Sequence, residues 1–172
     1  MEDKFFISIL INSIVTLSGV LLAYYFAKRR YFYEKLFDKK LVVLEEIYGK
    51  VIFIEENIKK YIYTVGANPT MESLPQKREE ILLIQNKLLE LRDYFQKKEI
   101  LLNEDSVSVI KYFIDLSIKV IAELGASIIS QNLRDSEIFR NQFNNGRSLM
   151  ENELSKVKSQ LKDDFKKTIK KE

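Results

Sequence analysis

The feature that most constrains this chain is a run of 23 residues without a charged side chain, from Phe5 to Ala27. At a helical rise of about 1.5 Å per residue the run is about 34 Å long, enough to cross a hydrocarbon core of about 30 Å. A buried core helix is the alternative, but such helices rarely stay uncharged for so long. A cleaved signal peptide fits poorly, because the residues before the run are not basic and no small-residue cleavage site follows it. We therefore expect residues 1–30 to form a single N-terminal transmembrane anchor.

Small and polar residues fall on one side of this run. Ser8, Asn12, Thr16, Gly19 and Ala23 recur every three or four residues, and at 100° per residue they lie within an arc of about 80°. An amide near mid-span is costly in hydrocarbon, and stripes of this kind are typical of close helix–helix contact. Two arrangements fit: a packed homodimer seam, or a ring of helices whose stripe faces a water-filled lumen. Both predict a homo-oligomer.

Aromatic and basic residues follow the run. Tyr24 and Tyr25 stand where an interfacial aromatic belt is expected, and Lys28, Arg29 and Arg30 come directly after it. Segments rich in Lys and Arg beside a span stay in the cytoplasm. We expect these five residues to anchor the chain at the interface of the inner (cell) membrane. The N-terminus would then lie outside and the C-terminal domain in the cytoplasm.

Residues 31–172 are expected to form a cytoplasmic helical bundle of about four helices, so the predicted fold class is all-α. Only 5 Gly and 2 Pro interrupt the chain, and its apolar residues recur at spacings of three and four. The segment Thr64–Pro75 reads as a loop. The pattern predicts helices before this loop, over Gln76–Lys98, from a cap at Asn103, Asp105 or Ser106 to about Asn132, and without interruption from a cap at Asp135 or Ser136 toward the C-terminus.

The third of these helices has an unusual distribution of charge. Lys111, Asp115, Lys119 and Glu123 recur every four residues with alternating sign, and most of the remaining positions are apolar. Four charges argue against a second membrane span. The pattern favours the central helix of a bundle, or a helix shared with a neighbouring subunit.

The absence of histidine and cysteine excludes many chemistries. A chain without either residue has no His-based triad, Cys nucleophile, disulfide or ordinary structural zinc site. The paired carboxylates Glu45–Glu46, Glu55–Glu56 and Glu79–Glu80 match no metal or acid/base spacing, and we expect them to face solvent. The sequence therefore predicts no enzyme activity, no cofactor, no metal site and no small-molecule substrate.

One short segment resembles part of a known motif. HEPN ribonucleases use an Arg, often followed by a polar residue, and then a His after four to six intervening residues; Arg140–Asn141 is similar to the opening of that motif. No His follows, because Asn145, Gly146 and Arg147 occupy the corresponding positions. The layout of one N-terminal span, a helical bundle and an incomplete Arg–Asn site resembles the small membrane accessory proteins of RNA-targeting type VI-B CRISPR systems. That resemblance implies assembly into a membrane pore in antiviral defence, with a CRISPR effector or RNA as partner.

These observations lead to one expected function and two alternatives. We expect a homo-oligomeric single-pass protein that forms a pore or perturbs the bilayer as an effector of bacterial antiviral defence. The first alternative is a membrane-tethered helical adaptor that recruits a soluble partner. The second is a degenerate HEPN-like RNA-binding module.

Overall fold

The computed structural model describes the backbone of residues 2–65, 74–132 and 136–170, and the side chains of residues 12–64, 74–131 and 136–168. The described residues form helices and no strand, which confirms the expected all-α fold class. The chain divides into two compact units, Met1–Lys40 and Leu41–Glu172. Helix α1 (Glu2–Val65) contributes to both units.

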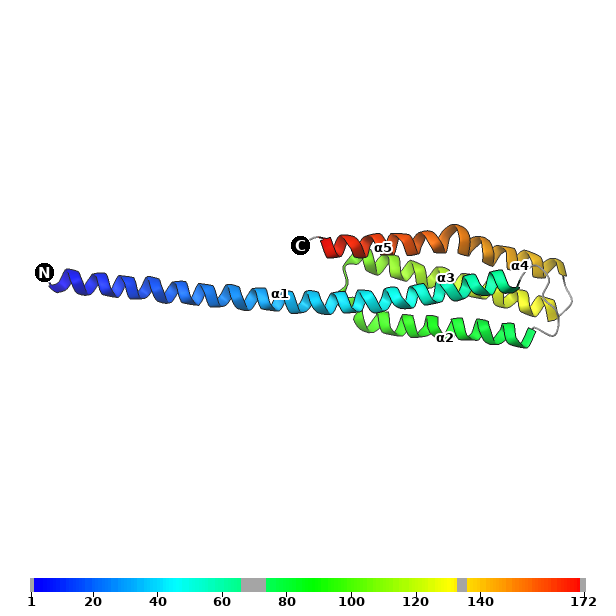
Figure 1. Ribbon diagram of the computed structural model, residues 1–172, viewed down its shortest axis with the longest axis horizontal. Helices are drawn as coiled ribbons and strands as arrows, with labels where there is room; N and C mark the ends of the chain where they lie inside the picture. The colour runs from blue at the N-terminus through cyan, green and yellow to red at the C-terminus, as the bar shows by residue number, and fades with distance from the viewer. Residues whose placement is uncertain (1, 66–73, 133–135, 171–172) are drawn as a thin grey trace. The chain divides into compact units, whose positions relative to one another are not determined.

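The second unit is a helical bundle, as predicted. It combines the last part of α1 with α2 (Leu74–Lys98), α3 (Glu104–Asn132) and a final segment made of α4 (Ser136–Leu149) and α5 (Ser155–Lys170). A short 3₁₀ turn, Glu99–Leu101, follows α2. Figure 1 shows that consecutive segments of the bundle alternate in direction. This arrangement places the four helical segments around one core.

Apolar residues spaced by three and four build that core. On α2 the buried positions include Ile81, Ile84, Leu88, Leu91 and Phe95, which recur at the spacings of three and four from which the helix was predicted. The last part of α1, together with α3, α4 and α5, adds similar stripes to one continuous cluster. Full burial of one such side chain stabilises a fold by about 1.5–3 kcal/mol, so the bundle is held together mainly by these stripes.

A polar cap fixes the start of α3. The Asn103 side-chain oxygen accepts the backbone N–H of Ser106 at 3.0 Å. This bond satisfies one of the N–H groups that the first turn of a helix leaves free. Of the three capping residues considered from the sequence, Asn103 is the one that precedes the helix.

The final helical segment differs from its prediction. The sequence pattern predicts an uninterrupted helix, whereas the structure has a π-helical turn, Met150–Leu154, between α4 and α5. Met150 and Leu154 are fully buried, so both ends of this turn face the core. Such a turn inserts a residue into an α-helix without needing Gly or Pro, which is why the breaker residues did not indicate it.

Two predicted boundaries concern residues that the structure describes only in part. Residues 66–73 of the expected loop lie outside the described residues, and α2 begins at Leu74, slightly before the predicted start at Gln76. Asp135 also lies outside them, and α4 begins at Ser136.

Candidate functional site

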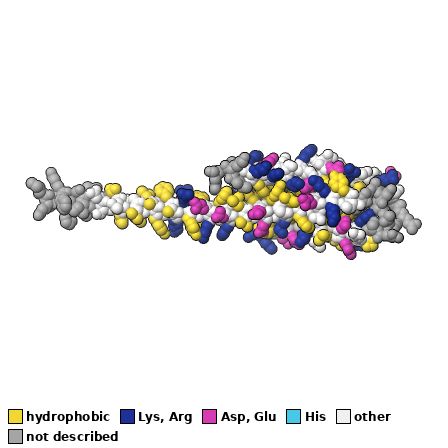
Figure 2. Space-filling model, viewed as in Figure 1, with side chains coloured by type: hydrophobic (Ala, Val, Ile, Leu, Met, Phe, Trp, Pro, Cys, Tyr) yellow, Lys and Arg dark blue, Asp and Glu magenta, His cyan; other side chains and the backbone are white. Residues whose placement is uncertain are grey.

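The first unit exposes apolar side chains around its helix. Every described side chain from Asn12 to Leu36 is exposed, including Leu17 at 65% and Leu21 at 61%. Figure 2 shows these hydrophobic side chains along the described part of the unit. Exposed apolar surface of this extent marks contact with another protein or with lipid. Nothing within the described part of the unit covers it.

The predicted stripe of small and polar residues lies on this exposed helix. Asn12, Thr16, Gly19 and Ala23 are all exposed, and the side chain of Ser8 lies outside the described residues. The Thr16 hydroxyl donates to the Asn12 backbone carbonyl at 2.8 Å, so its proton is already used within the helix. A Cβ added at Gly19 meets no atom within 4 Å. The described part of the stripe is therefore open to close approach by another helix.

Aromatic and basic side chains alternate directly after the stripe. Tyr24 and Tyr25 are exposed, as are Lys28, Arg29 and Arg30. The Arg29 guanidinium donates to the Tyr33 hydroxyl at 3.4 Å and lies 5.5 Å from the centroid of the Tyr33 ring. Arg30 forms an ion pair with Glu34 at 2.8 Å. These contacts lie within one helix and are exposed, so each is worth at most about 1 kcal/mol.

Among the residues with described side chains, no helix has an apolar stretch long enough to cross a membrane. Residues 5–11, which belong to the charge-free run, lie outside that set.

The Arg140–Asn141 pair lies on the surface of α4. Both side chains are exposed, and they are close in sequence to Gly146, which is buried against α3. Further along the same segment, Arg147 forms an ion pair with Glu151 at 2.9 Å. Within the described residues, Arg140 forms no ion pair. The structure thus shows Arg140 and Asn141 on a solvent-facing helix surface.

Glu55 is a buried carboxylate that the sequence analysis assigned to solvent, and that assignment is wrong. Its side chain is 1% exposed and accepts three bonds: Lys59 at 2.6 Å, Ser155 at 3.1 Å and Lys158 at 2.5 Å. Lys59 follows Glu55 by one helical turn, whereas Ser155 and Lys158 come from α5, directly after the π-helical turn. The network therefore joins α1 to α5 in the bundle core. By contrast, its neighbour Glu56 is exposed.

The charge state of Glu55 follows from these contacts. Burial alone raises its pKa, but the hydrogen bonds and positive charges of Lys158 and Lys59 outweigh burial and hold the pKa below its usual value of 4.5. Glu55 is therefore ionised at neutral pH. Its full burial leaves no access for a substrate, so we interpret it as a structural ion pair. The available sequence signal was its position, because Glu55 interrupts the apolar stripe between Val51 and Ile58.

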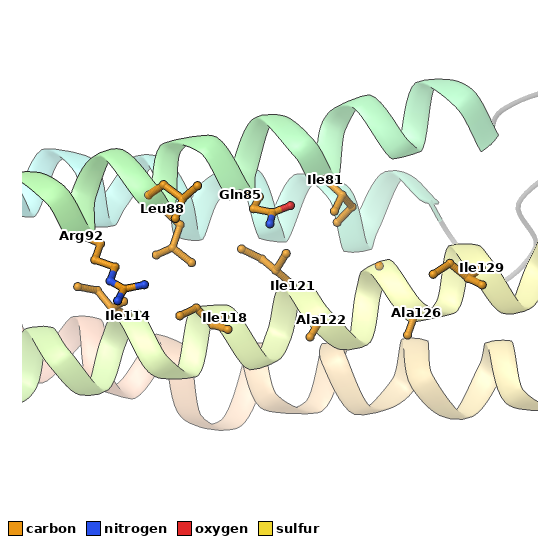
Figure 3. A pocket seen from close by; sticks show the side chains of 12 residues that line it. Ile81, Gln85, Leu88, Arg92, Ile114, Ile118, Ile121, Ala122, Ala126 and Ile129 are labelled. Atoms are coloured by element: carbon orange, nitrogen blue, oxygen red, sulfur yellow. The ribbon is translucent and has the colours of Figure 1, made fainter.

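A groove with a volume of about 500 Å³ lies between α2 and α3. Figure 3 shows α2 and α3 forming its two sides, with Leu88 and Arg92 on α2 facing Ile114, Ile118 and Ile121 on α3. Aliphatic side chains make up most of the lining, and Gln85 and Arg92 supply its longer polar groups. The sequence analysis did not predict this groove. The sequence did indicate that most positions of α3 beside its four alternating charges are apolar, but not which neighbour borders them.

Carboxylates elsewhere in the bundle are dispersed. Among the described residues, no three acidic side chains lie close enough together to hold a metal ion. Comparisons of the chain with protein-family models, with curated proteins and with solved structures find no match.

Proposed function

We propose that this chain is a single-pass membrane protein that self-associates through residues 5–27 and makes the bilayer permeable. The observation that carries the proposal is the exposure of every described side chain from Asn12 to Leu36, on a helix that contains the charge-free run of residues 5–27. Outside the stripe of small and polar residues, the exposed side chains of residues 12–27 are mainly apolar, and such side chains have a large cost in water and little cost in lipid. A bilayer accounts for most of that surface.

The stripe supports self-association over a passive anchor. Lipid covers Leu17 and Leu21 favourably, but it offers no hydrogen bond to the amide of Asn12. A second copy of the helix offers amide and hydroxyl partners and fits closely beside Gly19. Several copies of this helix with their stripes facing inward would surround a polar path through the bilayer. Leucine at the stripe positions would leave no polar path.

The aromatic and basic segment after the run supports an orientation. Lys28, Arg29 and Arg30 favour the cytoplasmic side, so the bundle would lie in the cytoplasm. In this proposal the bundle regulates or organises the assembly, and residues 5–27 act on the membrane.

Dye release from liposomes tests the proposal. Full-length protein reconstituted in dye-loaded vesicles should release dye, and Asn12→Leu should remove most of the release because it deletes the amide from the stripe. Ser18→Leu is the matched control. It makes a similar change about 120° around the helix from the centre of the stripe and should keep most of the release.

Two results would overturn the proposal. One is a strictly monomeric particle for the full-length protein in detergent. The other is equal release from wild type, from Asn12→Leu and from a variant whose span is replaced by polyleucine, since a passive anchor predicts no dependence on the stripe.

A further inference from the structure

The outer face of α2 and the outer face of α3 each carry a row of residues at the spacing found where helices pack against one another. We call each row a seam. On each helix six positions follow one another at spacings of 4, 3, 4, 3 and 4, the spacing by which one helix packs against another. The α2 seam consists of Arg78, Leu82, Gln85, Leu89, Arg92 and Gln96. The α3 seam consists of Lys111, Asp115, Ile118, Ala122, Gly125 and Ile129. The two seams border the groove of Figure 3.

Large apolar side chains stand exposed in both seams. Leu82 and Leu89 are 48% exposed, Ile118 is 45% exposed and Ile129 is 62% exposed. The solvent face of a bundle helix normally carries polar residues at such positions. Exposed aliphatic side chains at the middle of both seams, among longer polar ones, are typical of a docking surface.

Gly125 lines the groove, and the packing of the bundle does not require a glycine at this position. A Cβ added at Gly125 meets no atom within 4 Å, whereas one added at Gly146 lies 2.9 Å from Leu124 Cδ2. Gly146 is thus needed for the packing of α4 on α3. Gly125, by contrast, has no neighbour in the bundle that needs its missing side chain, and it leaves room for an external one.

We propose that the α2/α3 groove is the docking site for a second copy of the bundle, related by a twofold axis parallel to the helices. This inference rests on the self-association in the proposed function and assigns a surface to it in the second unit. The axis brings α3 of one copy onto α2 of its partner and keeps each residue at its own level along the helices. It also keeps Leu41 of both copies at one end of the paired bundles, as two chains anchored in one membrane require.

Charge complementarity favours a second copy of the bundle as the occupant of the groove. Arg92 and Ile114 line the same end of the groove in Figure 3. Asp115 follows Ile114 by about 1.5 Å along α3, so it is close to the level of Arg92. Both side chains are exposed, and neither forms an ion pair with any described residue of its own chain. The twofold axis brings Arg92 against the partner's Asp115 and Asp115 against the partner's Arg92. Two opposite-charge pairs are thereby made at once.

The apolar positions match in the same arrangement. Leu88 lies across from Ile118 in Figure 3. Leu89 also lines the groove and follows Leu88 by about 1.5 Å along α2, so it is close to the level of Ile118. The axis therefore brings Leu89 against the partner's Ile118. Half-exposed aliphatic groups on both helices are removed from water by one contact.

Disulfide cross-linking tests the contact, because the chain contains no cysteine. Full-length Leu89→Cys and Ile118→Cys proteins with different tags are mixed in detergent and oxidised. A disulfide-linked pair carrying both tags is expected. The matched control pairs Leu89→Cys with Gln160→Cys on α5, which is exposed on another helix, and it should give no such product.

Charge reversal in mixed copies tests the pairing. Arg92→Asp or Asp115→Arg alone should reduce the cross-link by about tenfold or more, because like charges meet across the axis. Mixing Arg92→Asp copies with Asp115→Arg copies should restore it, since both pairs are then opposite in sign. A pair formed inside one chain cannot be rescued in this way, and rescue also shows that both variants are folded.

The results separate this inference from the proposed function. A wild-type oligomer that gives no cross-link between Leu89→Cys and Ile118→Cys overturns the docking site and leaves self-association standing. A cross-link that ignores the charge reversals overturns the twofold arrangement. A monomeric wild-type protein overturns both proposals.

Discussion

Glu55 shows how one residue type can be placed against its usual preference. A buried carboxylate costs several kcal/mol unless it is paired and hydrogen-bonded. Here two lysines and one hydroxyl satisfy it, and the lysine ends remain partly exposed: the side chains of Lys59 and Lys158 are 36% and 26% exposed. The network therefore keeps the negative charge inside the bundle while the positive charges retain contact with water.

The stability of the bundle should depend on pH through this residue. Because the folded pKa of Glu55 lies below 4.5, its ionised form stabilises the fold above that pH, and the contribution is lost as pH falls through the folded pKa. At pH 7 we expect Glu55→Gln to lower the free energy of unfolding by about 1–3 kcal/mol. Urea unfolding followed by circular dichroism should show this gap from wild type narrowing as the pH falls below 4.5.

Glu56→Gln is the matched control, since Glu56 is exposed and adjacent in sequence. A surface change of this kind is expected to alter stability by no more than about 0.5 kcal/mol. If Glu55→Gln and Glu56→Gln give the same stability at every pH, the buried network contributes nothing measurable and our interpretation of Glu55 is wrong.

Individual residues show which features could be predicted from the sequence and which could not. The pattern predicted a helix over Gln76–Lys98 and placed the cap of α3 at Asn103, Asp105 or Ser106, because both depend on local spacing and local hydrogen bonding. The burial of Glu55 depends on Lys158, which is 103 positions away in sequence. No local pattern contains such a pairing, although the interruption of an apolar stripe by a carboxylate was a usable warning.

At the scale of helices, the contact between α3 and α4 depends on Gly146. Its missing side chain leaves room for Leu124, whose Cδ2 and Cγ would lie 2.9 Å and 3.0 Å from an added Cβ. Leu124 is fully buried and has little freedom to move. Alanine is favoured over glycine in a helix by about 1 kcal/mol, but overpacking a core costs about 1–3 kcal/mol.

We therefore expect Gly146→Ala to leave the bundle less stable than Gly49→Ala by about 1–3 kcal/mol. Gly49 is the matched control because it also lies inside a helix, and a Cβ added there meets no atom within 4 Å. Thermal or urea unfolding of the two full-length variants measures the difference. Equal stabilisation by both substitutions would contradict the close α3–α4 contact.

The π-helical turn and the α2/α3 groove belong to the part that sequence patterns could not supply. Helix periodicity assigns one face of each helix to the core, and it did so correctly for most of the bundle. It does not say that Met150–Leu154 takes an extra residue, because no breaker marks the turn. Nor does it distinguish an exposed apolar seam from a second core face, which requires knowing the neighbours of each helix.

At the scale of the whole chain, two units with different surfaces follow each other. The first consists of a helix with exposed apolar side chains, and the second buries its apolar residues in one cluster. The sequence indicated this contrast through the position of its charges alone.

The basic segment after the charge-free run should decide on which side of the membrane the second unit lies. Replacing Lys28, Arg29 and Arg30 together by Glu should invert the chain in part or in full, because Lys and Arg beside a span set its orientation. Protease treatment of intact spheroplasts measures the outcome: a C-terminal tag should be protected in wild type and cleaved in the variant.

The control replaces Lys156, Lys162 and Lys166, exposed on α5, by Glu. It changes the net charge equally, but the orientation should stay as in wild type because long domains cross regardless of their charge. Protection of the tag in all three proteins would contradict an orientation set by this segment, and cleavage in wild type would contradict a cytoplasmic bundle.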